Sequence, residues 1–282
     1  MSIIMQIHNI KSIKDFTFEI PTEKGLYALT GENASGKSTI ISCASTAFYN
    51  PLLYSYFGEP YDGSSIYFKF NGKERKISSM GKKWIGADKN IGITGFFEGS
   101  LVFGNRFKDV DFRLLKQLAK VTKEQLSPAS SFIKDNLGLI LHDNKLFYKN
   151  LYILKGEHLK AYGLIKPIFY YETNDMLINQ LSMSTGENLL LTILYSIELR
   201  LKKEIYGKQP SFILLDEIEL AIHSSALRRM VYFLKNLAND NNFVVIFSTH
   251  SIELIRSIPP ENIYYLQRHN DCLLYTSPSP RD

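Results

Sequence analysis

One glycine-rich segment constrains the fold of this chain more than any other feature. It follows a short apolar stretch, residues 25–30, and precedes a stretch of helical composition, residues 37–49. Glycines let the backbone curl so that several N–H groups face one point at the start of a helix, which makes a phosphate site. The segment therefore predicts a strand, a phosphate loop and a helix, in that order. The residues expected to contact phosphates are Gly31, Asn33, Ala34, Ser35, Gly36, Lys37, Ser38 and Thr39.

Two side chains of this loop predict what the phosphates belong to. Lys37 can place a point charge on the β- and γ-phosphates of ATP. Ser38 can offer its hydroxyl to Mg²⁺, which prefers oxygen ligands and keeps several of its waters. The alternative is a glycine-rich turn with a chance lysine, and the flanking strand and helix argue against it. ATP and Mg²⁺ are therefore the expected ligands.

Two adjacent acids end a fully apolar run in the second half of the chain. Residues 212–215 are apolar, and Asp216 and Glu217 follow them directly. A buried strand would deliver Asp216 to the carboxyl edge of a sheet, where it could hold Mg²⁺. Glu217 could then act as the catalytic base that polarises a water for attack on the γ-phosphate. The alternative is that both acids cap the helix that follows.

The hydrophobic patterns predict an α/β fold. We expect strands at residues 3–10, 13–20, 25–30, 65–70, 73–79, 211–215, 243–247 and 263–267, with Asn71-Gly72 as a hairpin turn. We expect helices at residues 37–49, 111–137, near Glu157, at 186–205 and along the apolar stripe 227–237, with Thr122 and Gln125 capping a second helix inside 111–137. Two wholly apolar strands indicate a parallel sheet covered on both faces.

The segment Leu181-Ser-Met-Ser-Thr-Gly-Glu187 resembles the signature motif of ABC-type ATPases, in the S-x-G-E form of their SMC/RecF/OLD-like branch. In that family, two ATPase heads enclose two ATP molecules. The resemblance implies that Ser184 and Gly186 contact the γ-phosphate held by another copy of the chain. The alternative is an ordinary helix cap in which Ser184 pairs with Glu187.

The order of the motifs supports the same family. His250 follows the strand at 243–247 and matches the switch histidine, so the resemblance implies a catalytic contact with the γ-phosphate. Glu219 and His223 match a D-E-x-E-x-x-x-H run of AbiEii-like relatives and are weaker interface candidates. Two departures are Thr185, where many relatives have glycine, and Ser224, where most have proline.

The glutamine of the family's Q-loop cannot be assigned from the sequence. Gln117 falls inside a helical pattern, and Gln125 matches a helix cap.

The resemblance implies a P-loop NTPase of ABC type with a mostly parallel central sheet, N-terminal antiparallel strands and a helical insertion lobe. We expect an ATPase head over residues 1–270, with one lobe at about 1–104 and 206–270 and a helical signature lobe at about 105–205. Residues 271–282 change character abruptly and can be encoded by the end of a transposase library adapter. We therefore expect an artefact there and a truncated native C-terminus.

The predicted function is hydrolysis of Mg-ATP by a homodimer, in DNA repair or in anti-phage or toxin-type defence, with DNA and a nuclease partner or domain implied. Two alternatives stay open: the nucleotide-binding subunit of an ABC transporter, and a nucleotide-gated switch that does not hydrolyse ATP.

The net charge of +5 is spread along the chain, the two cysteines are far apart, and no signal peptide or membrane span is evident. These features predict a cytoplasmic protein that does not bind a membrane.

Overall fold

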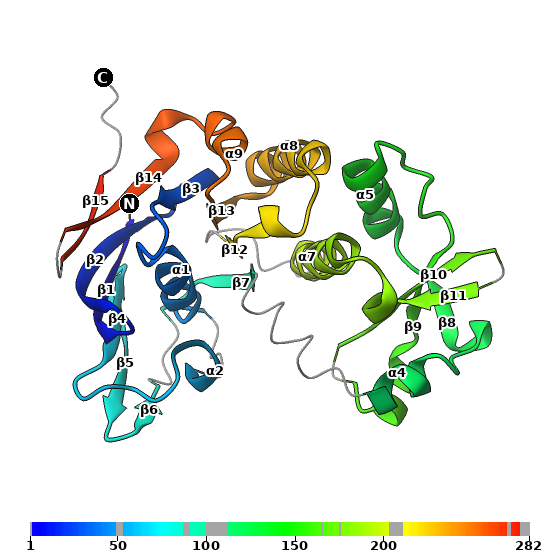
Figure 1. Cartoon of the computed structure of the whole chain (residues 1–282), viewed down its shortest axis with the longest axis horizontal. Coiled ribbons are helices and arrows are strands. Elements are labelled where there is room, and N and C mark those ends of the chain that lie inside the picture. The colour runs from blue at the N-terminus through cyan, green and yellow to red at the C-terminus, as the bar shows by residue number, and fades with distance from the viewer. Residues whose placement is uncertain are drawn as a thin grey trace. The chain divides into compact units, whose positions relative to one another are not determined.

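The computed structural model describes residues 2–48, 53–86, 91–99, 112–164, 166–174, 176–202, 211–269 and 272–276. The chain divides into two compact units, and Figure 1 shows the elements of both. The first unit comprises residues 1–101, 204–218 and 231–282, and the second comprises residues 102–203 and 219–230. The lobe boundaries predicted at about 104/105 and 205/206 lie outside the described residues and stay predictions. Residues 219–230, predicted in the first lobe, group with the second unit.

A six-stranded sheet forms the centre of the first unit, in the order β15-β14-β3-β13-β12-β7. Its strands are β3 (Gly25–Gly31), β7 (Thr94–Gly99), β12 (Ser211–Asp216), β13 (Phe243–Ser248), β14 (Ile263–His269) and β15 (Cys272–Thr276). All neighbouring pairs are parallel except β14 and β15. Every residue of β12 and β13 is buried, as continuous apolar strands of a covered parallel sheet require. The predicted α/β class is confirmed.

A second, antiparallel sheet in the same unit has the order β2-β1-β4-β5-β6. Its strands are β1 (Ser2–Ile10), β2 (Ile13–Pro21), β4 (Ser65–Phe70), β5 (Lys73–Met80) and β6 (Lys83–Ile85). Burial alternates along β1 and β2, so one face of the sheet packs on the core and the other is exposed to solvent. The turn between β4 and β5 has positive φ at Asn71 and Gly72, which confirms the predicted hairpin.

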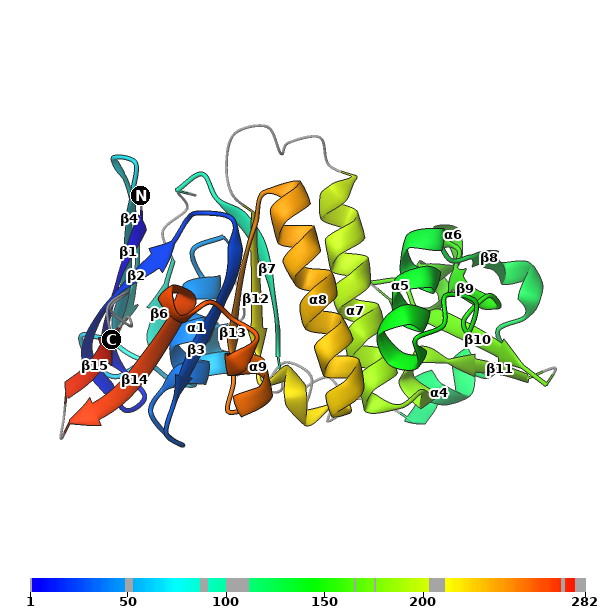
Figure 2. The same ribbon diagram turned by 90° about the horizontal axis from the view of Figure 1, so that it is seen from above.

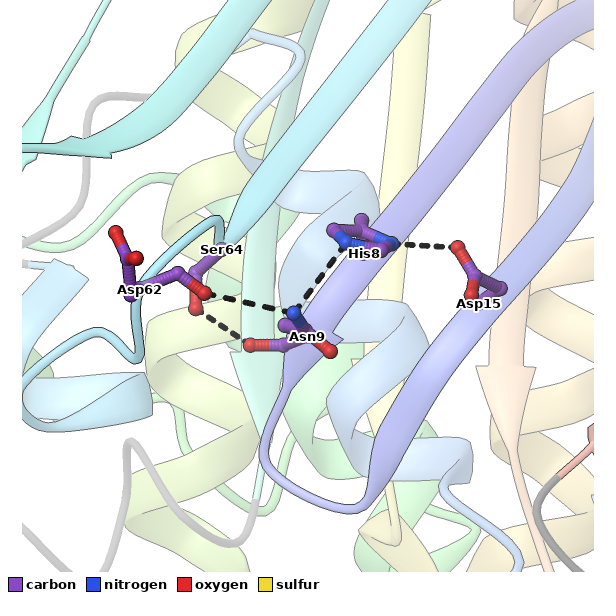
Figure 3. A network of polar contacts seen from close by, with 5 residues as sticks. All are labelled: His8, Asn9, Asp15, Asp62 and Ser64. Atoms are coloured by element: carbon purple, nitrogen blue, oxygen red, sulfur yellow. Dashed lines mark hydrogen bonds and ion pairs between the residues drawn. The ribbon is translucent and has the colours of Figure 1, made fainter.

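Polar contacts fix the end of the β1–β2 hairpin, as Figure 3 shows. The carbonyl of Asn9 accepts a hydrogen bond from Ser64 Oγ at 2.5 Å, and its side-chain amide donates to the carbonyl of Asp62 at 3.4 Å. His8 Nδ1 lies 2.5 Å from Asp15 Oδ1 across the two strands. His8 and Asp15 also line a recess of about 450 Å³ on this sheet.

Helices cover the sheets of the first unit. They are α1 (Lys37–Ser45), α2 (Leu53–Phe57), α9 (Ile252–Arg256), the 3-10 turn η6 (Pro260–Asn262) and the later part of α8 (Ser224–Asn241). Almost all of α1 is buried, because it lies between the antiparallel sheet and the central sheet (Figure 2). It ends at Ser45, before the predicted limit of residue 49, and Phe48 beyond it stacks on Phe212. Burial raises the pKa of the Cys43 thiol, which fits a structural role for this residue.

The second unit combines helices with a four-stranded antiparallel sheet of order β11-β10-β9-β8. The strands are β8 (Leu126–Pro128), β9 (Leu151–Leu154), β10 (Phe169–Thr173) and β11 (Met176–Asn179). The helices are α4 (Phe112–Leu118), α5 (Ser131–His142), α6 (Gly156–Leu159) and α7 (Thr185–Leu201), with the 3-10 turns η1 (Lys123–Gln125), η2 (Lys160–Tyr162) and η3 (Gln180–Ser182). The turn η5 (Ile218–Leu220) lies at the boundary of the two units.

The predicted helical stretch at 111–137 is wrong in its middle. Thr122 and Gln125 do form a capping box, but it starts only the single turn η1, and strand β8 follows. Pro128 disfavours helical geometry at the residue before it and cannot donate a helical hydrogen bond. Leu126 joins a buried apolar cluster with Leu118 and Tyr170, so tertiary burial decides for the strand. The next helix, α5, starts only after the cap Ser130.

Other differences concern lengths and short strands. The helix predicted near Glu157 is the single turn α6, and α7 ends at Leu201 rather than at residue 205. The sequence predictions missed β7 and the strands β9–β11. Residues 272–276 pair with β14 as β15. Since pairing of this kind uses backbone groups that any sequence has, the adapter origin of residues 271–282 stays a prediction.

In the parts of the chain that the structure describes, no helix is long and apolar enough to cross a membrane.

The approach of β7 to β12 gives a test of the central sheet. A Cβ atom at Gly95 would lie 2.6 Å from the Phe212 carbonyl oxygen and 2.8 Å from the Phe48 ring. We expect Gly95→Ala to lower the free energy of unfolding by about 1–3 kcal/mol, because the added methyl group overpacks this site. Urea denaturation measures the loss. The matched control Gly86→Ala, where a Cβ meets nothing within 4 Å, should stay within about 0.5 kcal/mol. Equal effects of the two changes would contradict the close approach.

Candidate functional site

The predicted phosphate loop joins the end of β3 to the start of α1. Three of its residues have positive φ: Gly31 (148°), Ala34 (61°) and Gly36 (95°). Gly31 also has no room for a side chain, because a Cβ atom would lie 2.4 Å from the Leu266 carbonyl oxygen on β14. Gly36 is the N-cap of α1 and provides no side chain to satisfy the first N–H groups of the helix. These groups are those that a bound anion would satisfy.

Lys37 is almost fully buried, and its ammonium group lies inside the loop. Its Nζ donates to the carbonyl oxygens of Gly31 at 3.1 Å and Glu32 at 2.8 Å, and to Ser35 Oγ at 3.4 Å. The loop itself therefore holds the positive charge in place. Ser38 on α1 is half-buried, whereas Asn33 and Ala34 are exposed.

Asp216 is the last residue of β12 and is 1% exposed. Its carboxylate accepts a hydrogen bond from the hydroxyl of Ser248, the last residue of β13. The Ser248 hydroxyl in turn accepts the N–H of Glu217 at 3.1 Å. Ser248 therefore fixes the orientation of one predicted site residue and the backbone of the next.

The parallel register places these residues at one edge of the sheet. Asp216 pairs with Ser248, and Ser248 pairs with Leu29, two residues before the phosphate loop. The N–H of Thr249 donates to the Leu29 carbonyl at 3.1 Å, which ties the segment that carries His250 to β3. Because parallel strands end at the same edge, the loop, the acids and His250 come from adjacent positions there.

Glu217 and His250 both lie just beyond this edge. Glu217 has φ of 51°, an unusual value for a residue with a long side chain, and is only partly buried. His250 is exposed, and Ser251 after it caps α9 by accepting the N–H of Leu254 at 3.4 Å. The Glu217 backbone is held through its N–H, and the backbone of His250 is held through its neighbours Thr249 and Ser251.

The signature segment lies in the second unit, at the start of α7. Ser184 is the N-cap, and it forms a capping box with Glu187. The Ser184 N–H and hydroxyl donate to Glu187 Oε2 at 2.9 and 2.6 Å, and the Glu187 N–H donates to Ser184 Oγ at 3.3 Å. The helix cap that the sequence offered as an alternative is present. It does not decide the role of Ser184, because the residue is exposed.

Gly186 has a structural reason to be glycine. A Cβ atom there would lie 2.7 Å from the carbonyl oxygen of Ala221, in the segment that also carries Glu219 and His223. The start of α7 and this segment therefore approach each other closely inside the second unit. His223 Nδ1 lies 3.1 Å from Ser225 Oγ, next to the start of α8.

Glu187 has further partners that the sequence predictions missed. Its Oε1 accepts the hydroxyl of Tyr148 at 2.7 Å, and the same Tyr148 oxygen lies 3.1 Å from His142 Nε2. Partial burial acts to raise the pKa of the Glu187 carboxyl, but hydrogen bonds from Ser184 and Tyr148 outweigh it, so the pKa is lowered. Burial lowers the pKa of His142, helped by the nearby guanidinium of Arg229. No spacing signal marks Tyr148, because it lies far from the signature in the sequence.

Gln180 and Asn188 form hydrogen bonds that flank the signature segment in the sequence. The buried Gln180 amide donates to Asn188 Oδ1 on α7 at 3.0 Å, and its oxygen accepts the N–H of Phe169 at 3.3 Å. The one sequence feature that could have indicated this contact is the position of Gln180, directly before the signature segment. The Q-loop glutamine stays unassigned, since Gln117 lies on α4 and Gln125 serves the cap of η1.

The residues at the sheet edge fit a magnesium ion. Asp216 supplies a carboxylate at the end of a buried strand, and Ser38 supplies a hydroxyl one residue after Lys37. Oxygen donors of this kind are those that Mg²⁺ prefers, and ATP phosphates and water complete its octahedral shell in such sites.

Solved structures with the same fold are ATPase heads of SMC proteins. The chain matches a structure titled "Crystal structure of the SmcHead bound to the C-winged helix domain of ScpA" with a TM-score of 0.57 and 14% identity, covering 99% of this chain and 97% of that one. It also matches an Smc head domain with an extended coiled coil from Pyrococcus furiosus, bound to the C-terminal domain of ScpA, with a TM-score of 0.53 and 12% identity, covering 97% and 96%. At such identities these matches establish the fold, which is that of the P-loop ATPase heads.

Family models identify the chain more closely. One model, described as "AAA domain, putative AbiEii toxin, Type IV TA system", matches residues 97–256, and an "AAA domain" model matches residues 5–83. The first covers more than half of the chain, which belongs to this family of AbiEii-like AAA domains. No curated protein matches the sequence significantly. Fold and family fit a nucleotide-binding ATPase, and the predicted resemblance is confirmed.

The hydroxyl of Ser248 can be tested without nucleotide. We expect Ser248→Ala to lower the free energy of unfolding by about 1–3 kcal/mol, because the change removes the hydroxyl that donates to the buried, charged Asp216 carboxylate. It also removes one acceptor of the Glu217 N–H, which keeps its bond to the Ser248 carbonyl at 3.3 Å. Urea denaturation followed by circular dichroism measures the loss. Ser257→Ala is the control, since it removes one hydroxyl bond to the Leu254 carbonyl and should cost at most about 1 kcal/mol. A Ser248→Ala cost no larger than this control would contradict the role assigned to Ser248.

Proposed function

We propose that the chain binds Mg-ATP at the phosphate loop and hydrolyses it. The observation that supports this most is the parallel register of β3, β13 and β12. It brings the phosphate loop, Asp216, Glu217 and His250 to one edge of the central sheet. Ligands of open α/β sheets bind at that edge.

The phosphate loop and Lys37 bind and orient the triphosphate. The N–H groups at the start of α1 face the β- and γ-phosphates, and the Lys37 ammonium moves from the loop carbonyls to phosphate oxygens of greater negative charge. Ser38 and Asp216 would hold Mg²⁺, which neutralises charge that develops on the phosphates. Asp216 keeps its orientation through Ser248.

Glu217 and His250 act on the attacking water and the γ-phosphate. Glu217 orients the water and accepts its proton, and His250 donates a hydrogen bond to the γ-phosphate. The hydrogen bond of the Glu217 N–H to Ser248 supports this role, because catalysis of this type depends on positioning.

The site is completed by a second copy of the chain. Ser184 is exposed at the N-terminus of α7, a helix of seventeen residues, and a helix N-terminus favours an anion. The resemblance to ABC-type heads supports placing Ser184 and Gly186 against the γ-phosphate bound to the partner copy. The protein is then a homodimer around two ATP molecules.

The wider role follows from the family. We extend the proposal to DNA repair or to defence of the toxin or anti-phage type, in the cytoplasm, with a nuclease as partner or further domain. The AbiEii-like family match supports defence, and the SMC heads, which bind ScpA in the matched structures, support a protein partner. The net charge of +5 permits contact with DNA.

Two other functions share most of these residues. A transporter subunit would need a membrane partner, and the S-x-G-E form at 184–187 argues against it. A nucleotide-gated switch would bind ATP without hydrolysis, and the presence of Glu217 and His250 argues against that.

Glu217→Gln tests hydrolysis directly. The amide cannot accept a proton, so phosphate release should fall about 10²–10⁴-fold while ATP binding persists. Phosphate release and fluorescent-nucleotide binding measure the two properties. The matched control is Glu261→Gln, an exposed carboxylate on η6 of the same unit, which should keep the wild-type rate. Equal rates for Glu217→Gln and the wild type would exclude Glu217 as the base.

Mixing two inactive variants tests the composite site. Lys37→Ala removes the phosphate contact of one copy, and Ser184→Ala removes the signature contact of the other. If Ser184 acts on the partner's nucleotide, an equal mixture forms heterodimers with one intact site. It should then regain about a quarter of the wild-type rate, given a symmetric dimer with independent sites. Phosphate release measures the recovery. A mixture no more active than its components would show that Ser184 does not act across the dimer.

A further inference from the structure

Two side chains outside the signature segment, Tyr148 and His142, determine which groups the Ser184 hydroxyl can bind. The Tyr148 hydroxyl is 2.7 Å from Glu187 Oε1, and Tyr148 is completely buried. Because Glu187 is ionised, with its pKa lowered, it accepts the single hydroxyl hydrogen of Tyr148. The Tyr148 oxygen can then only accept, so His142 Nε2, 3.1 Å away, carries a hydrogen and donates to it.

One aromatic contact and one arginine hold this chain of hydrogen bonds in place. The His142 ring stacks on Phe147 with centroids 3.6 Å apart. Arg229 donates to the carbonyl oxygens of Ile140 and Leu141, at the end of α5 next to His142, at 2.8 and 3.0 Å. The rings of His142 and Tyr148 therefore have little freedom to follow Glu187 if it moves.

The other carboxylate oxygen, Glu187 Oε2, takes the hydroxyl hydrogen of Ser184. That hydrogen is the one that Ser184 needs to donate to a phosphate oxygen. When Ser184 turns to a phosphate, Glu187 loses one of its three donors and keeps Tyr148 and the Ser184 N–H. The Glu187 carboxylate then lies close to the negatively charged phosphate. The repulsion between the two is smaller when fixed hydrogen-bond donors disperse the charge of the carboxylate.

We propose that Tyr148, oriented by His142, is a positioning residue that frees the Ser184 hydroxyl for the γ-phosphate of the partner copy. Tyr148 holds Glu187 Oε1, so that Glu187 Oε2 can release Ser184. Without the Tyr148 hydroxyl, Ser184 is the one side-chain donor to Glu187 among the described residues, and Glu187 competes with the phosphate for its hydrogen. The inference rests on the proposed composite site and adds residues that the signature motif does not contain.

The experiment combines Tyr148→Phe with Ser184→Ala in the full-length chain carrying Glu217→Gln, so that bound ATP persists. Analytical ultracentrifugation with ATP measures dimer formation. Tyr148→Phe should weaken ATP-driven dimerisation about tenfold, as loss of one charge-assisted hydrogen bond does. It should add nothing in the Ser184→Ala background, because it acts through that hydroxyl. His142→Gln, whose amide can also donate, should dimerise like the parent.

A matched tyrosine separates this effect from a general loss of stability. Tyr152 of the same unit also donates its hydroxyl to a glutamate, at 3.1 Å, but this glutamate is Glu172 on β10 and not Glu187. Tyr152→Phe should leave dimerisation unchanged. A second readout needs no nucleotide: NMR titration should show the pKa of the Glu187 carboxyl rising in Tyr148→Phe and not in Tyr152→Phe.

The outcomes distinguish the two proposals. If Ser184→Ala dimerises like the parent, the composite site is wrong. If Ser184→Ala weakens the dimer but Tyr148→Phe weakens it further by the same factor, or if the pKa of Glu187 does not change, the positioning role of Tyr148 is wrong and the composite site stands.

Discussion

The hydrogen bonds of Ser248 are the interaction on which the sheet edge depends. One hydroxyl donates to the Asp216 carboxylate and accepts the Glu217 N–H, and its residue is paired with Leu29 in front of the phosphate loop. The carboxyl ends of β3, β12 and β13, which are far apart in the sequence, are thereby held next to one another at the same edge of the sheet. A carboxylate buried as deeply as Asp216 needs such a donor, since an unsatisfied buried charge is costly. The same bonds that stabilise the strand ends therefore orient the groups proposed for catalysis.

In the second unit, the N-cap of α7 holds an exposed serine, Ser184, in a fixed position. The capping box of Ser184 and Glu187 is an ordinary way to start a helix, and here it is extended inward to Tyr148 and His142. Gly186 lets the backbone at Ala221 approach without a side chain between them. Structural and functional interpretations of this segment are thus compatible, because a rigid cap is what a precise contact with a phosphate requires.

The elements predicted well are those that local patterns specify. The strand, glycine turn and helix around Gly31–Lys37, the hairpin at Asn71-Gly72 and the apolar strands β12 and β13 follow from turn chemistry and continuous apolar runs. The structure contains all of them. The failures share a cause. Residues 122–128 have a helical start signal, but Leu126 is buried in a cluster with partners distant in sequence, and Pro128 ends the helical option. The sequence did not predict strand β7, because its residues Gly95 and Gly99 are poor strand formers. Both lie so close to β12 that a Cβ atom would not fit.

The sequence by itself determined the class of fold, the glycine turn between β3 and α1 and the order of the motifs, because residue type and spacing along the chain encode backbone conformation over short distances. It also named Asp216, Glu217, Ser184 and His250 as site residues. Only the tertiary structure revealed Ser248 as the partner of Asp216 and Tyr148 as the partner of Glu187. Both partners are held by hydrogen bonds between residues remote in sequence. Such bonds depend on strand register and helix packing, which no local pattern records.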